Sequence, residues 1–242
     1  MSFVITLFVR EGIVMASDSR LTLNNTVQQG AGGPRIVQLA VGQSDSSYKI
    51  FLAPNNIGIS TFGGADIQGV PMAGYIESFI SEKLSNAKHE VNDVAKQLLE
   101  YFTKLSSPPD TQFYVAGYVT EAGKRQQHVW HVSVSRKSVE RKNPPDQQGA
   151  QWGGEADILN RLTQAVGMLD AQGNLTERIP SLGIPFQFFT LQDAIDFAVY
   201  AVKVTADSIR FQPRAKTVGG PIDVLVIKPD DAFWVQRKEL HV

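Results

Sequence analysis

Two short apolar segments near the beginning of the sequence are separated by only three residues. The first spans residues 3–9 and the second spans residues 13–17, and Arg10-Glu11-Gly12 stands between them. Short segments rich in β-forming residues, joined by a tight turn that contains glycine, are typical of a β-hairpin. The sequence therefore predicts that the chain opens with two paired strands.

Polar residues with reactive groups stand at both ends of this hairpin. Ser2 directly precedes the first strand, and Ser17-Asp18-Ser19-Arg20 closes the second strand with one acid and one base. The small side chain of Ser2 favours the removal of Met1. Without Met1, Ser2 carries a free α-amine and a hydroxyl on one residue, and this combination is a nucleophile with its own base.

The bulk composition excludes several classes of function. The 242 residues are 43% hydrophobic, which is enough for one sizeable core, so a single domain over residues 1–242 is expected. Lys and Arg number 23 against 24 Asp and Glu, and this balance argues against nucleic acid or an anionic membrane surface as a partner. The absence of Cys rules out disulfides and Cys-based metal or redox chemistry. No apolar stretch approaches the roughly 20 residues of a membrane span and the first segment does not match a signal peptide, so a cytoplasmic protein is predicted.

Hydrophobic periodicity predicts strands and helices in groups. After the hairpin, strands are expected at residues 49–52, 57–61, 113–120, 128–135, 222–227 and 233–238. Helices are expected at residues 65–84, 91–105, 156–168 and 191–209. This order differs from the βαβα alternation of a parallel sheet, and it predicts the α+β class with antiparallel sheets and paired helices.

Three polar or irregular segments are interpreted as connections. They span residues 24–47, 136–148 and 170–190. For the first segment two interpretations stay open. It is either a long surface loop or a hairpin centred on residues 30–34, with a strand at residues 36–41.

Several of these features occur together in a known order. They are Ser2, Gly12, the stretch from Ala16 to Arg20, Lys49, and Gly63-Gly64-Ala65-Asp66. In order and spacing they resemble the β-subunits of the proteasome family, which are N-terminal-nucleophile (Ntn) hydrolases with bacterial relatives of the HslV, Anbu and betaproteobacterial types. The resemblance covers nearly the whole chain. It implies a four-layer αββα sandwich, in which two antiparallel sheets are flanked by helix pairs.

The resemblance also implies a role for each residue of the site. The hydroxyl of Ser2 would attack an amide carbonyl, and the α-amine of Ser2, through a water molecule, would take the proton. Lys49 would disfavour the protonated amine by its charge, and Asp18 would pair with Lys49. The backbone N–H of Gly63 would stabilise the oxyanion.

Three stretches depart from the pattern of the family. The nucleophile is Ser2 where the family usually has Thr. Residues 152–155 read Trp-Gly-Gly-Glu in place of a Ser-containing turn, and residues 215–220 lack the Asp and the Ser that the family has before its double glycine. Those groups orient the terminal amine in the family, and Thr217 or Glu155 are open candidates for replacing them.

The resemblance further implies a small, mostly neutral substrate pocket without a charge at its base. Its predicted lining residues are Leu21, Ser47, Phe51, Thr61 and Ala65. Such a pocket is predicted to accept uncharged side chains.

No metal site or cofactor is expected. His128 and His131 are three positions apart on a predicted strand, and an odd offset places them on opposite faces. One metal ion could not bind both.

The leading functional prediction is a serine/threonine-type peptidase that cleaves peptide or protein substrates with Ser2 inside a homo-oligomeric ring, whether or not an unfoldase ATPase serves it. Two alternatives stay open. The absent accessory Asp and Ser favour a non-catalytic ring or scaffold subunit of the same fold. A Ser nucleophile and long insertions favour a small-molecule amidohydrolase.

Overall fold

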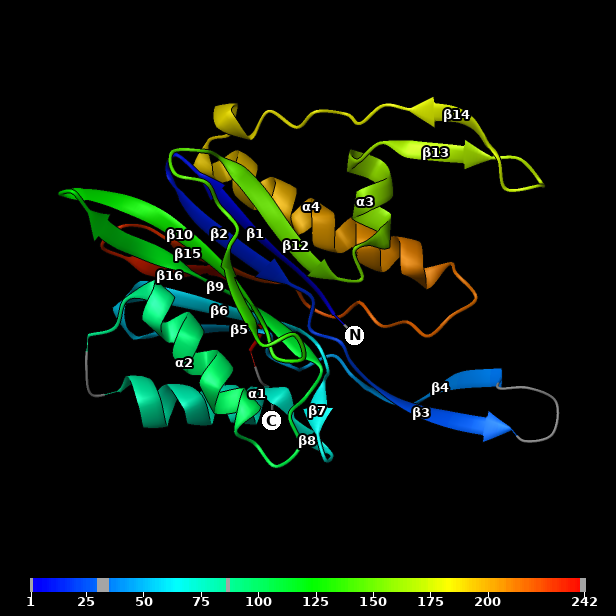
Figure 1. Cartoon of the computed structure of the whole chain (residues 1–242), viewed down its shortest axis with the longest axis horizontal. Coiled ribbons are helices and arrows are strands. Elements are labelled where there is room, and N and C mark those ends of the chain that lie inside the picture. Colours follow the sequence, from blue (N-terminus) through cyan, green and yellow to red (C-terminus); the bar gives the residue numbers. More distant parts are fainter. Residues whose placement is uncertain (1, 30–34, 86–87, 240–242) are drawn as a thin grey trace.

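The predicted opening hairpin lies at the centre of a five-stranded antiparallel sheet (Figure 1). The computed structural model describes residues 2–29, 35–85 and 88–239. The strand order of this first sheet is β12–β1–β2–β15–β16. Its strands are β1 (Phe3–Val9), β2 (Gly12–Ser17), β12 (Gly149–Gly154), β15 (Asp223–Ile227) and β16 (Ala232–Gln236). Every residue of β1 and β2 is buried, which explains why both strands are apolar on both faces.

A second five-stranded antiparallel sheet has the order β11–β10–β9–β6–β5. Its strands are β5 (Ile50–Ala53), β6 (Ile57–Gly63), β9 (Thr111–Glu121), β10 (Lys124–Ser133) and β11 (Ser138–Arg141). A short 3₁₀ turn, Pro54–Asn56, joins β5 to β6, and both asparagines have positive φ. Asn tolerates this left-handed conformation better than most residues, so the turn predicted from Pro-Asn-Asn is confirmed.

Three apolar clusters connect these sheets with each other and with the helices. One cluster joins the two sheets and includes Val4 and Phe8 of β1. A second joins the first sheet to α3 (Asp157–Thr163) and α4 (Leu191–Arg210), and it includes Phe3, Ile5 and Leu7. The third joins the second sheet to α1 (Met72–Phe79), the π-helical turn Ile80–Leu84 and α2 (Val91–Thr103). Alternate residues of β1 thus face α4 and the second sheet, as the period of a strand requires.

Helix α4 is fixed to the turn of the opening hairpin. A capping box between Thr190 and Asp193 begins the helix, and the Leu191 N–H donates to Glu11 Oε2 at 2.9 Å. Both carboxylates lie at the positive end of the helix dipole, where negative charge is stabilising. The helix predicted at residues 191–209 is confirmed almost to the residue.

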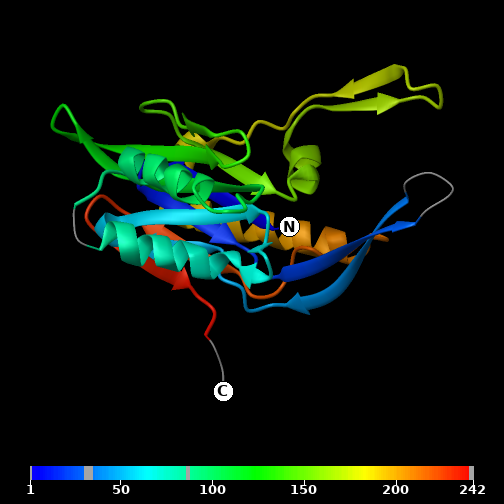
Figure 2. The same ribbon diagram turned by 60° about the horizontal axis from the view of Figure 1, so that its bottom comes forward.

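Two hairpins project from the sheets on the same side of the molecule (Figures 1 and 2). The first pairs β3 (Leu21–Gln29) with β4 (Arg35–Ser44), so the hairpin interpretation of this segment is confirmed and the surface loop is wrong. Its predicted centre, residues 30–34, lies outside the described residues. The second hairpin pairs β13 (Val166–Leu169) with β14 (Leu175–Ile179), where the sequence predicted the end of a helix and an irregular segment.

The helix predicted at residues 65–84 begins later, at Met72. Residues before it form a small hairpin of β7 (Asp66–Ile67) and β8 (Val70–Pro71). Gln68 and Gly69 have positive φ, and the Gly69 N–H donates to Asp66 Oδ2 at 2.9 Å. This turn replaces the first part of the predicted helix. Pro71 has an extended backbone directly before α1, so the helix begins only after it.

Strands β11 and β12 were missed because their sequences are poor in β-forming residues. Half of β12 is glycine, yet it pairs with β1 along its whole length. Tertiary pairing therefore overrides local propensity here. The prediction that residues 136–148 are only a linker is wrong, since β11 lies within them.

The described residues combine several antiparallel sheets with four helices, which agrees with the predicted α+β class. None of these helices is both long and apolar enough to cross a membrane.

Candidate active site

A buried ion pair lies where the second strand of the hairpin ends. Lys49, directly before β5, places its Nζ 2.7 Å from Asp18 Oδ1 and 2.7 Å from the carbonyl oxygen of Arg20. The side chain of Asp18 is 0% exposed and that of Lys49 is 4% exposed. Because a buried charge is stable only with a partner and hydrogen bonds, each residue depends on the other.

The Asp18 carboxylate also binds three backbone N–H groups. Its Oδ1 accepts from Phe3 at 3.0 Å, and its Oδ2 accepts from Arg20 at 3.1 Å and Gly219 at 3.0 Å. These donors come from β1, from the segment after β2 and from the segment before β15. The carboxylate thus holds the residue next to Ser2 in register with both neighbouring segments.

Burial lowers the pKa of Lys49, and the charges of Lys238 and Arg20 lower it further. The charge of Asp18 and its hydrogen bond oppose this effect. The cation at Lys49 therefore relies on the Asp18 carboxylate.

Ser2 lies at the start of β1 and is 7% exposed. Its carbonyl oxygen accepts a hydrogen bond from the Glu155 N–H at 2.8 Å. Gly154 has a φ of +87°, and a Cβ there would lie 1.7 Å from the Ser2 carbonyl oxygen. Only glycine fits this approach, so Gly154 is required by its contact with Ser2, whereas Gly153 lies against the ring of Phe62.

The two open candidates for the accessory groups bind each other. Thr217 Oγ1 donates to Glu155 Oε1 at 2.7 Å, and Arg214 donates to Glu155 Oε2 at 2.9 Å. Glu155 and Thr217 are both buried. They lie on the β12 side of Ser2, because the backbone of Glu155 contacts the Ser2 carbonyl.

Ser2 and Lys49 line a common pocket with a volume of about 10 Å³, which is room for about one water molecule. Four of the predicted lining residues take part, namely Leu21, Ser47, Thr61 and Ala65. Sequence reasoning missed Tyr48, Phe62, Gly64 and Met72, which complete the wall. Tyr48 precedes Lys49 directly, so its position next to a site residue was the available signal.

The prediction for Phe51 needs correction, because this residue does not line the pocket. Phe51 packs in the apolar cluster that joins the second sheet to α1 and α2. Its neighbour Ile50 belongs to the cluster between the sheets. Phe51 shares a strand face with Lys49, but its ring packs in the helix-side cluster with Met72 and not at the pocket.

Gly63 ends β6 between Phe62 and Gly64, both of which line the pocket. Its φ is +98°, and a Cβ would lie 2.9 Å from the carbonyl oxygen of Asp110. The Gly64 N–H donates to that oxygen at 2.8 Å. Glycine is therefore required at position 63 by the backbone, and its role as an oxyanion donor stays a prediction.

His128 and His131 lie on opposite faces of β10, as predicted. His131 stacks on Phe62 between the sheets, whereas Trp130, which shares a face with His128, packs against the helix-side cluster. Within the described ranges, no group of three or more His, Asp or Glu residues is placed to hold a metal ion.

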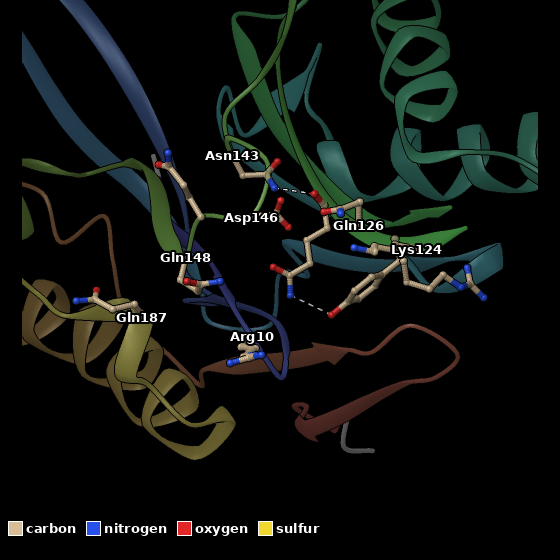
Figure 3. A pocket seen from close by; sticks show the side chains of 11 residues that line it. Arg10, Lys124, Gln126, Asn143, Asp146, Gln148 and Gln187 are labelled. Carbon is tan, nitrogen blue, oxygen red and sulfur yellow. Dashed lines mark hydrogen bonds between the residues drawn. The ribbon is translucent and has the colours of Figure 1, made fainter. Parts of the chain in front are cut away.

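A larger polar pocket of about 500 Å³ lies at the opposite end of β1 (Figure 3). Arg10 of the β1–β2 turn lines it together with Lys124, Gln126 and Asp146. Seven residues of extended strand, roughly 20 Å, separate this end from Ser2. It contains none of the predicted site residues, so we regard the small pocket at Ser2 as the candidate active site.

A second buried lysine–aspartate pair was missed by sequence reasoning. Lys238, after β16, pairs with Asp223, which lies opposite Ser17 in the first sheet. No pattern in the sequence distinguishes Lys238 from an exposed lysine.

In comparisons with known proteins, no family model and no curated protein matches the chain. Geometry and residue chemistry are therefore the grounds for assigning a function. They bring together a hydroxyl residue at a strand end, a buried lysine–aspartate pair and a small pocket, which is an arrangement suited to nucleophilic catalysis.

Proposed function

We propose that this chain is a proteasome-like Ntn amide hydrolase, in which Ser2 is the nucleophile when it is the first residue of the chain. Met1, whose removal is predicted, lies outside the described residues. The observation that carries the proposal is the pair of Asp18 and Lys49. It is buried, it is bonded to the backbone next to Ser2, and Lys49 shares the pocket with Ser2.

The layers of the molecule support the same class. The two antiparallel sheets share one apolar cluster, and each sheet has helices on its other face. This arrangement is consistent with the four-layer αββα sandwich of Ntn hydrolases. Fold alone does not define an activity, so the proposal depends on the site.

In the first half of the reaction, Ser2 Oγ attacks the carbonyl carbon of the scissile amide. The α-amine of Ser2 takes the hydroxyl proton through a water molecule. The cation of Lys49 favours the unprotonated amine before this step, because like charges repel. Negative charge develops on the carbonyl oxygen, where the Gly63 N–H stabilises it.

Collapse of the tetrahedral intermediate breaks the C–N bond. The leaving amine departs with the proton that the α-amine received, and an ester of Ser2 remains. A water molecule then attacks the ester carbonyl and gives its proton to the α-amine. When the C–Oγ bond breaks, the proton returns to Ser2 Oγ and the carboxylic acid is released.

Glu155 and Thr217 take the place of the absent accessory groups in this proposal. The backbone N–H of Glu155 donates to the Ser2 carbonyl oxygen, and the Glu155 carboxylate accepts from Thr217. A carboxylate at this location can orient the terminal amine and the water that relays its proton. Arg214 holds the other carboxylate oxygen.

We further propose that the substrates are peptides with uncharged side chains, and that copies of the chain form a ring. The mainly uncharged lining of the pocket favours such substrates. The two projecting hairpins offer surfaces for contacts between copies. Exposed apolar side chains on the second hairpin, such as Leu169 and Leu175, support this use.

The test uses protein whose mass and N-terminal sequence show that it begins at Ser2 and is otherwise complete. It is incubated with a broad peptide library, with small acyl amides and with a peptide carrying an electrophile directed at N-terminal nucleophiles. Cleavage together with an adduct on Ser2 would support the peptidase. Turnover of small amides alone would support the amidohydrolase. Absence of both turnover and adduct would leave the non-catalytic subunit.

A further inference from the structure

The second buried ion pair lies beside the first one. Asp223 is 0% exposed, and its carboxylate accepts from both the backbone N–H and the ammonium group of Lys238. Asp223 pairs in register with Ser17, the residue before Asp18. The Asp223–Lys238 pair is therefore attached to the same strand end as the Asp18–Lys49 pair.

Lys238 also contacts the wall of the Ser2 pocket. Its Nζ lies 4.3 Å from the ring centroid of Tyr48, a distance that is typical of a cation–π interaction. The guanidinium of Arg237 lies 5.1 Å from the same centroid and 4.7 Å from that of Trp234. Tyr48 lines the pocket and directly precedes Lys49. The segment after β16 is thus held over a residue of the candidate active site.

We propose that Lys238 is a positioning residue of the Ser2 site, which holds Tyr48 in the pocket wall and, through its pair with Asp223, keeps the charge beside Lys49 balanced. The proposal rests on the proposed function. Nothing in the pairing of β15 with β16 requires a buried lysine beyond the strand end. An exposed lysine would leave Asp223 without a cation, and a buried carboxylate without a partner is strongly unfavourable.

The charges around Lys238 determine what its removal would do. Asp223, Arg237 and Asp18 act on Lys238, and Lys238 in turn acts on Lys49. Without the ammonium group, Asp223 would leave a net negative charge beside the site. Negative charge favours a protonated amine, so Ser2 would need a higher pH to react.

The experiment compares protein that begins at Ser2 with three variants of it: Lys238→Met, Lys238→Arg and the double variant Asp223→Asn/Lys238→Met. One measurement is the rate at which a peptide electrophile labels Ser2, followed against pH. The other is the rate of Tyr48 nitration by tetranitromethane, which does not depend on catalysis. Circular dichroism establishes that each variant is folded.

For Lys238→Met, the acid limb of the labelling profile should move up by about one pH unit, which is about a tenfold loss on that limb. Tyr48 should be nitrated faster. Lys238→Arg should retain the original profile and nitration rate. The double variant removes both charges, so it should restore the profile while Tyr48 remains readily nitrated.

An unchanged profile and unchanged nitration in folded Lys238→Met would overturn the inference, as would an equal shift in Lys238→Arg. If Lys238→Met does not fold, the double variant decides: faster nitration of Tyr48 supports the inference, and an unchanged rate overturns it. If the original protein is labelled at no pH, the proposed function fails. Nitration alone then decides the inference, since faster nitration in Lys238→Met supports it and an unchanged rate overturns it.

Discussion

The two flanks of Ser2 are built differently. On the β2 side, Asp18 and Lys49 are almost completely buried, and the carboxylate binds three backbone N–H groups as well as the lysine. On the β12 side, Glu155 binds Thr217 and Arg214, and the side chain of Arg214 is 34% exposed. The first flank is tied to the backbone of the central sheet, whereas the second is tied to side chains at its margin.

This difference indicates how much each flank tolerates substitution. A buried carboxylate with several backbone donors has no substitute of the same geometry, because each lost bond leaves a buried donor unsatisfied. A carboxylate that is held only by other side chains can be replaced by a carboxylate from a different position in the sequence. The β12 side is also where the sequence departs from the pattern of the proteasome family.

Asp18→Ala should have the largest effect, because it removes the carboxylate on which the β2 side of Ser2 depends. It leaves Lys49 buried without its anion and three backbone donors without an acceptor, so we expect a loss of about 3–5 kcal/mol in the free energy of unfolding. Urea denaturation measures this loss. The matched control is Asp230→Ala, because Asp230 is paired with Arg125 at 2.6 Å but is 82% exposed. The control should lose less than about 1 kcal/mol, and an equal loss in both variants would contradict the contrast.

Glu155→Gln tests the second flank with little change of shape. The amide retains one acceptor but loses the charge that binds Arg214, so we expect a loss of about 1–2 kcal/mol, clearly below that of Asp18→Ala. Labelling of Ser2 should slow but persist. Complete loss of labelling in a folded Glu155→Gln protein would show that both flanks are equally indispensable.

Thr217→Val should have a smaller effect. It removes one hydrogen bond to Glu155 while Arg214 remains, and the expected loss is about 1 kcal/mol. Combining Thr217→Val with Glu155→Gln gives a double-mutant cycle. Two losses that simply add would argue against a shared network, since bonded residues normally show coupling.

The ion pair of Asp45 and Arg20 at the surface should give the smallest effect. Arg20 donates to Asp45 at 2.7 Å and lowers the pKa of this carboxyl from 3.8. A lowered pKa in the folded state gives stability that is present above about pH 4 and is lost as the pH falls through the folded value. Asp45→Asn should cost less than about 1 kcal/mol at pH 7, because the Asp45 side chain is 44% exposed. In thermal unfolding against pH, the two proteins should converge at low pH.

The sequence predicted the first flank because its residues lie close to strand ends that hydrophobic patterns reveal. Ser2 and Asp18 border the opening hairpin, and Lys49 directly precedes a short apolar strand. Resemblance to a known family supplied the roles that are predicted for them. Phe51 was placed wrongly because its ring packs against α1 and α2, a tertiary contact that has no local signal in the sequence.

The remaining features depend on contacts between distant segments. Strand β12 has few residues of high β propensity, and only its pairing with β1 makes it a strand. The same pairing explains Gly154, which lies against the carbonyl of Ser2. In the sequence nothing distinguishes Lys238 from an exposed lysine, and only the folded sheet places it beside Asp223. Such features follow from tertiary structure and leave no local signal.

The most direct test of the central claim is the mass of the adduct formed by a peptide electrophile on protein that begins at Ser2. Peptide mapping should locate a single adduct on Ser2, and Ser2→Ala should remain unlabelled although folded. Acetylation of the α-amine should also prevent labelling, since the amine is the proposed base. Folded protein with a free Ser2 that forms no adduct at any pH from 5 to 9 would contradict the account.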